Sequence, residues 1–283
     1  MKTKLLVCCH SESEKGEGLW VTVRAGAALG GKEIQCDFRD DDGENISALN
    51  PFYNELTVLY WAWKNLDKLG DPDYVGLMHY RRFFYWDEAR TEVRLRTNVP
   101  AADFAKKSLL SEDCVSTLLQ EGDFICPRPS RRRSVYKHYA MTHRIEDLLA
   151  AVDVLKRLKP EYAEAAKEYL AGNENFFFNM FVLPKALFLR YADFIFPILE
   201  AYTKERGLKD RLYVSERLTG IFLHQLMREG LTPVYLPVLC REEKFKGKVK
   251  AFFKEWKSVK GLKAKARAAA RLLLRRRGES KKI

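Results

Sequence analysis

The sequence lacks the long apolar runs and the terminal signals that mark membrane-spanning and secreted proteins. No stretch approaches the roughly 18 uncharged apolar residues that a membrane-spanning helix needs. The apolar run from Leu5 to Cys9 is shorter than the roughly 7–15 residues of a signal-peptide core. We therefore expect a cytosolic protein.

The sequence is also poor in cysteine motifs and in the common catalytic templates. Its six cysteines form no CxxC pair and no spacing typical of a zinc site, so we predict reduced thiols in the core. There is no GxGxxG after the first apolar run, no Walker phosphate loop, no GxSxG and no HExxH. The protein classes that depend on these motifs are therefore set aside.

Positive charge is concentrated at one end of the chain. The 283 residues carry a formal net charge of +12, from 50 basic and 38 acidic residues. Residues 241–283 hold 17 of the basic and 4 of the acidic residues, which leaves 33 basic and 34 acidic residues in 1–240. Because residues 1–240 have no overall positive excess, the composition argues against a nucleic-acid-binding protein.

Residues 1–240 have the composition and the patterns of a folded α/β domain. With 47% hydrophobic and 12% aromatic residues, the chain is not disordered. Short apolar runs alternate with helix-like segments, which predicts one domain built on a mixed α/β sheet. Strands are expected at 4–9, 34–38, 74–78, 124–126, 176–183 and 234–238, and helices at 51–66, from Ser111, at 145–170 with a break at Pro160, at 186–204 and at 215–228. Residues 11–31 are predicted to form a loop.

An acidic turn follows the second expected strand. It contains Asp41, Asp42, Asn45 and Ser47. Loops at the carboxyl ends of strands bind ligands in open α/β sheets, and carboxylates and amides can bind ribose hydroxyls and base edges. The alternative is a solvated turn followed by a helix N-terminus, and the local sequence does not decide between the two.

A polar tetrad follows the strand at 74–78 without a spacer. It consists of His79, Tyr80, Arg81 and Arg82. Two arginines at the ligand-binding edge of a sheet can neutralise a diphosphate through forked hydrogen bonds. The alternative is that either arginine forms a structural salt bridge with Asp41, Asp42 or Glu55.

Four other polar residues are candidates for the same site. His10 follows the first strand, Asn179 interrupts the apolar run 176–182, and Glu216 opens an otherwise apolar helix. Glu55, in the expected helix 51–66, is a second carboxylate. A buried amide needs partners, so Asn179 is expected to bind a ligand or a neighbouring loop. Glu216 is either a catalytic base or a simple complement to the helix dipole.

Two histidines outside this group carry less information. His138 and His143 are five residues apart, beside Lys137 and Arg144. A metal pair is conceivable, but the basic neighbours favour a structural or phosphate-facing role.

Several segments together resemble one bacterial family. The chain is similar to the capsular-polysaccharide and O-antigen glycosyltransferases first catalogued as a domain of unknown function, which include a galactofuranosyltransferase. The resemblance covers about residues 3–240 and is most specific between 41 and 83. It rests on DDGENIS (41–47), NELT (54–57), YWAWKN (60–65), YVGLMHYRRF (74–83), NMF (179–181) and SERL (215–218).

The resemblance implies a GT-A-like fold and transfer of a sugar from a UDP-sugar to a growing glycan, with UDP-galactofuranose the first donor to test. Metal-dependent GT-A enzymes carry an Asp-x-Asp just after a central strand. Here Asp71-Pro72-Asp73 precedes the strand at 74–78, so we expect it at the opposite edge of the sheet. We expect no metal cofactor, because cationic side chains of the tetrad would offset the charge of the departing diphosphate.

The competing function class is a non-catalytic, membrane-associated assembly module.

The glycosyltransferase interpretation assigns a role to each candidate residue. The acceptor is expected to be a lipid-linked glycan or an oligosaccharide, and Glu216 is the first choice of base, with Glu55 second. Donor contacts are assigned to His10, Asp41, Asp42, Asn45, Ser47, His79, Tyr80, Arg81, Arg82 and Asn179.

The basic segment 241–283 has its own pattern. Apolar residues recur at helical spacing between Phe245 and Val259, with lysines between them. This pattern is typical of an amphipathic helix on an anionic membrane, and a solvated or partner-packed tail is the alternative. The expected location is therefore the inner face of the cytoplasmic membrane, where lipid-linked glycans are built.

Truncation at residue 241 tests the membrane interpretation. We expect the truncated protein to lose binding to anionic liposomes in a flotation assay, because the apolar and basic residues of the tail provide the attraction. Activity on soluble acceptors should remain. Unchanged liposome binding would exclude the tail as the anchor.

Overall fold

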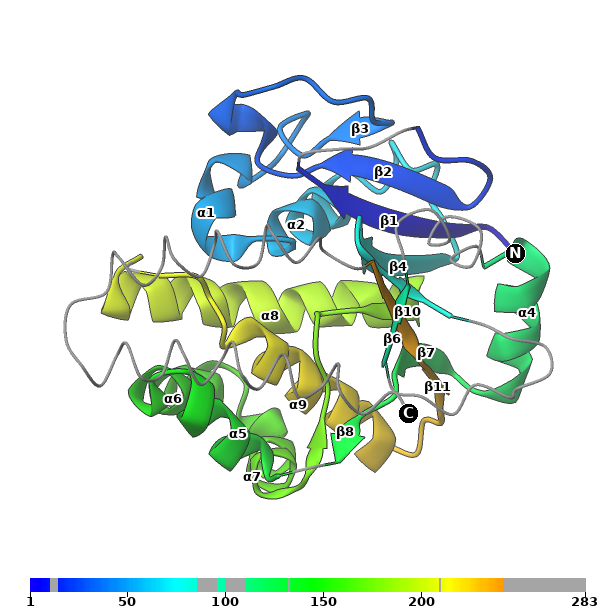
Figure 1. Cartoon of the computed structure of the whole chain (residues 1–283). Coiled ribbons are helices and arrows are strands. Elements are labelled where there is room, and N and C mark those ends of the chain that lie inside the picture. Colours follow the sequence, from blue (N-terminus) through cyan, green and yellow to red (C-terminus); the bar gives the residue numbers. More distant parts are fainter. Residues whose placement is uncertain (11–14, 86–95, 100–109, 132, 209, 242–283) are drawn as a thin grey trace. The chain divides into compact units, whose positions relative to one another are not determined.

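The computed structural model describes residues 1–10, 15–85, 96–99, 110–131, 133–208 and 210–241 (Figure 1). Contacts divide the chain into a body, Met1–Cys240, and a second unit, Arg241–Ile283. The predicted amphipathic helix between 245 and 259 lies outside the described residues. The body alone is described below.

A twisted mixed sheet forms the centre of the body. Its main path has the strand order β11-β7-β10-β4-β1-β2-β3, and β10 alone in this path runs opposite to its neighbours. The strands of this path are β1 (Thr3–Cys9), β2 (Trp20–Arg24), β3 (Phe38–Arg39), β4 (Tyr74–His79), β7 (Phe124–Pro127), β10 (Phe181–Pro184) and β11 (Pro233–Leu236).

Smaller strands extend the sheet near β4. There β5 (Arg82–Phe84) pairs with both β4 and β12 (Val238–Arg241), and β12 also pairs with β6 (Arg96–Val99). A separate two-stranded sheet joins β8 (Ser130–Arg131) to β9 (Glu174–Asn175).

Helices cover both faces of the sheet, because the central strands are apolar on both sides. Leu6 and Leu77 face a core shared with α2, α8 and α9, whereas Leu5 and Met78 face a second core with α4. Figure 1 shows α4 apart from the other helices. The helices are α1 (Asn50–Tyr53), α2 (Leu56–Lys64), α4 (Glu112–Glu121), α5 (Val135–Thr142), α6 (Ile145–Leu158), α7 (Ala163–Ala171), α8 (Lys185–Arg206) and α9 (Ser215–Arg228). The predicted mixed α/β sheet with flanking helices is confirmed.

Four predicted elements differ from the structure. The expected strand 34–38 is reduced to β3, Phe38–Arg39. Residues 11–31 are not only loop, because they contain β2. The expected helix 51–66 is split at Asn54, whose φ of +52° ends α1 before α2 begins. The expected strand 176–183 starts only at Phe181, because Phe178 and Asn179 have φ of +76° and +52°, outside the extended region.

The aspartates that precede β4 lie at its amino end, as expected. Asp71 forms an ion pair with Lys185, and the Asp73 carboxylate accepts a hydrogen bond from the Lys2 backbone N–H at 2.7 Å. Both carboxylates therefore help to anchor the start of β1 and α8, at the edge opposite the end of β4.

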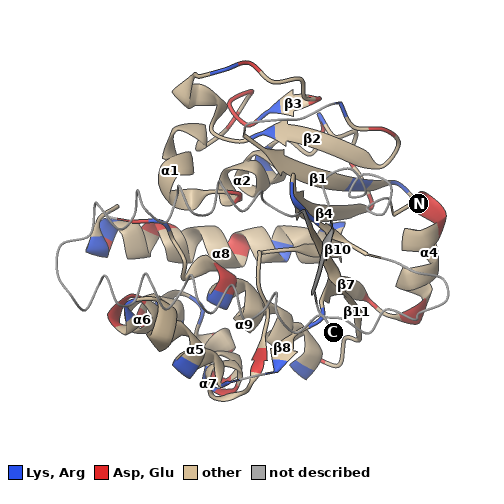
Figure 2. Ribbon diagram, viewed as in Figure 1, with Lys and Arg blue, Asp and Glu red and all other residues tan. Residues whose placement is uncertain are grey.

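Cysteine and charge distributions agree with the sequence expectations. The six cysteines form no disulfide, and four of them, Cys8, Cys9, Cys126 and Cys240, are buried. Figure 2 shows basic and acidic residues interspersed over the ribbon, in keeping with the near-neutral composition of residues 1–240. Among the described residues, no helix is both long enough and apolar enough to cross a membrane.

Candidate functional site

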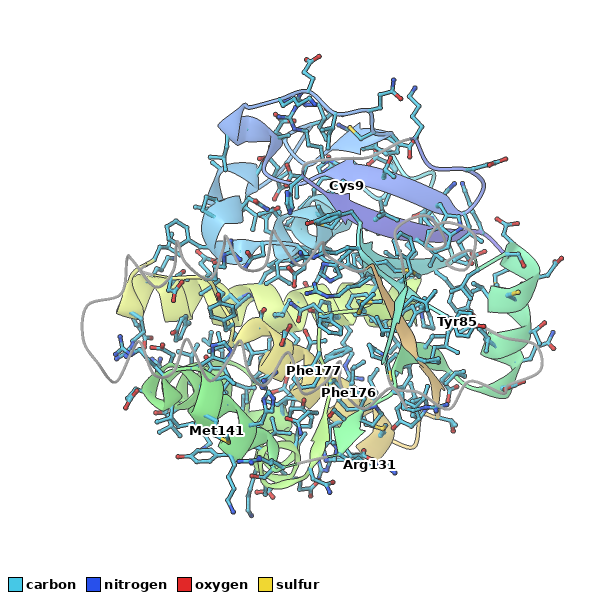
Figure 3. All side chains as sticks on the ribbon, viewed as in Figure 1. Cys9, Tyr85, Arg131, Met141, Phe176 and Phe177 are labelled. Carbon is cyan, nitrogen blue, oxygen red and sulfur yellow. The ribbon has the colours of Figure 1, made fainter. Side chains whose placement is uncertain are left out.

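Strand directions bring separated polar residues to one edge of the sheet. Because β1 and β4 are parallel and pair Cys8 with His79, His10 and Tyr80 follow them at the same edge. Because β10 is antiparallel to β4 and pairs Phe181 with Leu77, the residues before β10 reach this edge too. Figure 3 labels Cys9, the last residue of β1. The carboxyl edge of β1 and β4 is therefore where His10, the tetrad and Asn179 converge.

The predicted tetrad forms a tight hairpin between β4 and β5. His79 pairs with Arg82 across the hairpin, and Tyr80 and Arg81 form its turn. The His10 and Tyr80 rings meet edge to face at 4.8 Å, and the Arg81 guanidinium lies 5.5 Å from the Tyr80 ring centroid. The tetrad and His10 thus form one cluster.

His79 is buried and neutral within this cluster. Its Nε2 lies 2.7 Å from the Phe178 carbonyl oxygen, and because a carbonyl only accepts, Nε2 carries the proton. Burial, followed by the positive charge of Arg82, lowers the pKa of His79 to about 4. A neutral ring with Nε2 engaged supplies no positive charge to a diphosphate. His79 instead positions Phe178, which leaves Arg81 and Arg82 as the cations of the tetrad.

The loop before β10 is fixed by the side chain of Asn179. Its Nδ2 donates to Glu55 Oε1 at 2.8 Å and to Ser215 Oγ at 3.1 Å, and its Oδ1 accepts from Thr219 Oγ1 at 2.7 Å. The left-handed backbone of Phe178 and Asn179 costs on the order of 1–3 kcal/mol for each residue, which these hydrogen bonds offset. The buried Asn179 thus has partners at the start of α2 and in α9, and a donor contact by Asn179 stays a prediction.

The two candidate carboxylates are held by adjacent residues of this loop. Glu216 Oε1 accepts the Phe178 backbone N–H at 3.1 Å, while Glu55 accepts from the Asn179 amide. Burial raises the pKa of Glu55, although the Asn179 hydrogen bond and the charge of Arg82 act in the opposite direction. A carboxylate with a raised pKa at a sheet edge is a candidate for proton transfer.

The acidic turn is organised by Asp40, a residue not assigned to the site from sequence. Its buried carboxylate accepts hydrogen bonds from the backbone of residues 26–27, from Ser47 Oγ and from Thr57 Oγ1. The Ser47 hydroxyl also accepts from the Ala28 N–H at 3.0 Å. The Ser47 hydroxyl and the Asp40 carboxylate therefore both stabilise the position of the turn against α2.

The other predicted residues of the turn also have partners nearby. Asp41 forms a two-point pair with Arg39, and this hydrogen bonding lowers the pKa of Asp41. Asp42 forms an ion pair with Lys68 at 2.7 Å, and the Asn45 amide donates to backbone carbonyls of the same turn. These contacts favour the structural alternative for the turn, and a donor contact by Asp41, Asp42, Asn45 or Ser47 stays a prediction.

Arg217 is the main residue of this region that sequence reasoning missed. Its side chain is 1% exposed, and its guanidinium reaches Glu216 Oε2 at 3.3 Å and His138 Nδ1 at 3.2 Å. The available signal was an arginine among the small and apolar residues of the expected helix 215–228. Within the described residues, no group of three His, Cys, Asp or Glu side chains is placed to hold a metal ion.

Two comparisons, one with family profiles and one with solved structures, relate this chain to known proteins. The sequence profile described as "Domain of unknown function (DUF4422)" matches residues 4–236. A solved structure of WbbM, a bifunctional glycosyltransferase in its apo form, is similar with a TM-score of 0.74 and 28% sequence identity. The match covers 86% of this chain and 46% of the WbbM chain, so this chain spans about half the length of that protein. No protein of curated function matches.

The burial of a neutral His79 predicts a specific pH dependence of stability. An unfolded imidazole titrates near 6.5 and the folded one near 4, so between these values only the unfolded state binds the proton. The free energy of unfolding should therefore fall as the pH is lowered from 6.5 to 4, by roughly 3 kcal/mol in total from this residue. Above pH 6.5 this contribution is constant.

Urea unfolding of wild type and His79→Gln at pH 7.5 and pH 5 measures this effect. The glutamine amide can donate to the Phe178 carbonyl but does not titrate, so its stability should fall less between the two pH values. Contributions from other groups cancel in the comparison. Equal losses in both proteins would contradict a neutral, buried His79.

Proposed function

The chain belongs to the family described as a domain of unknown function (DUF4422), and we propose that it is a glycosyltransferase that uses a nucleotide-sugar donor. The match to WbbM supports glycosyl transfer in general. The observation that carries the proposal is the position of Arg81 and Arg82, directly after β4 and beside the loop that holds Glu55 and Glu216. Two cations and two carboxylates at one sheet edge suit the departure of an anion and the removal of a proton.

In the proposed reaction, a hydroxyl oxygen of the acceptor bonds to the anomeric carbon of the donor sugar. The bond between that carbon and the diphosphate breaks, and the nucleoside diphosphate leaves with the electron pair. Arg81 and Arg82 offset its charge through forked hydrogen bonds. Glu216, which the Phe178 N–H and the Arg217 guanidinium hold in place at this edge, takes the proton of the attacking hydroxyl.

The finer assignments extend the same proposal. The donor is a UDP-sugar, with UDP-galactofuranose the first to test, and the acceptor is a lipid-linked glycan or an oligosaccharide of the bacterial cell surface. No metal cofactor is required, because arginines take over its electrostatic role. The basic segment 241–283 holds the enzyme at the inner face of the cytoplasmic membrane.

Metal independence and the role of Arg81 are tested together. Purified protein should transfer or hydrolyse a UDP-sugar equally well with and without EDTA. Arg81→Ala should lower turnover by about 10²-fold or more, because one stabilising charge at the leaving group is lost. Arg157→Ala, which breaks a surface ion pair with Glu205, should leave turnover unchanged. Activity that depends wholly on added Mn²⁺ would contradict the proposal.

Glutamine variants of Glu216 and Glu55 distinguish which of the two carboxylates is the base. Glu216→Gln should reduce the rate of transfer by about 10²–10⁴-fold with little change in donor affinity, because an amide cannot accept the proton. Glu55→Gln keeps an oxygen that can accept from Asn179 and should lose much less. Single-turnover rates and donor titrations separate the two effects. Wild-type turnover in Glu216→Gln would remove Glu216 as the base.

A further inference from the structure

A group of side chains beyond Glu216 has no part in the donor chemistry. Arg217 is buried between two aromatic rings, with its guanidinium 5.2 Å from the Phe177 centroid and 5.5 Å from the Tyr139 centroid. It donates to Glu216 and to His138 Nδ1, and its own Nε is buried without a partner among the described residues. Arg217 therefore ties the proposed base to His138 and Phe177.

The bond from Arg217 fixes the tautomer of His138. An arginine only donates, so Nδ1 of His138 is an acceptor and the ring proton sits on Nε2. Burial, followed by the charge of Arg217, lowers the pKa of His138, which keeps the ring neutral at pH 7. His138 is half-buried, and no described residue accepts a hydrogen bond from its Nε2. It is an oriented donor available to a ligand.

Phe177 lies next to this donor and remains partly exposed. Its ring centroid is 5.2 Å from that of His138, at an interplanar angle of 54°. The next residue, Phe178, faces a different neighbour, because the Arg82 guanidinium lies 4.5 Å from its ring. Phe178 therefore contacts an arginine of the tetrad, whereas Phe177 contacts His138.

We propose that Phe177 and His138 form the subsite for the acceptor sugar, with Arg217 as the residue that positions both of them. This inference rests on the proposed function. A partly exposed aromatic ring suits the C–H face of a pyranose or furanose, and the Nε2–H of His138 suits a hydroxyl oxygen. Glu216 contacts Arg217, which also holds His138, so a hydroxyl of a sugar bound in this subsite would lie near the proposed base.

Acceptor kinetics with four variants test the subsite. The probe is whichever of octyl galactoside, octyl glucoside and octyl N-acetylglucosaminide the wild-type protein glycosylates fastest. Phe177→Ala and His138→Ala should each raise the KM for that acceptor by about tenfold or more, with the donor KM and the rate of donor hydrolysis unchanged. His138→Gln should recover part of the loss, because its amide can accept from Arg217 and donate to a hydroxyl. His224→Ala, in which a histidine of α9 loses its bond to Glu168, is the matched control and should behave as wild type.

The possible failures are distinguishable. A wild-type protein that neither hydrolyses the donor nor transfers to any of the three acceptors contradicts the proposed function itself. A wild-type protein that transfers, while Phe177→Ala and His138→Ala keep its acceptor KM, overturns the subsite alone. Parallel changes in donor KM, acceptor KM and melting temperature would indicate a purely structural role and would also overturn it.

Discussion

The site depends on one buried amide. Asn179 binds Glu55, Ser215 and Thr219 with a single side chain, and so joins the loop before β10 to the start of α2 and to α9. Buried polar groups are costly when unpaired, so an amide with three partners specifies one arrangement of these elements. That arrangement allows Phe178 and Asn179 to keep their left-handed backbone.

The fixed loop in turn sets the electrostatics of the sheet edge. The Phe178 carbonyl accepts a hydrogen bond from the Nε2–H of the neutral His79, and the Phe178 N–H donates to Glu216. His79 is therefore a neutral donor, and the positive charge of the tetrad comes from Arg81 and Arg82. The proposed reaction needs this separation of roles, with cations for the departing anion and a carboxylate nearby for the proton.

Much of the secondary structure could be predicted, because periodicity and caps are local. The strands at 4–9 and 74–78 and the helix at 215–228 are where the apolar pattern put them. The break at Asn54 and the turn at Phe178 and Asn179 could not be predicted. Positive φ at non-glycine residues is stabilised by contacts from elsewhere in the chain, and the local pattern in each case favoured a continuous element.

The sequence by itself determined the class of fold, the neutral body with its basic tail, and the placement of His79 to Arg82 at the carboxyl end of a central strand. Only the tertiary structure decided which of these residues meet. Glu55 and Asn179 are 124 residues apart, and His138 and Arg217 are 79 apart. Their contacts follow from the reversed direction of β10 and the packing of α9, which no local pattern records. The same packing placed Asp40, rather than Asp41 or Asp42, at the centre of the acidic turn, since burial and hydrogen-bond geometry select among adjacent carboxylates.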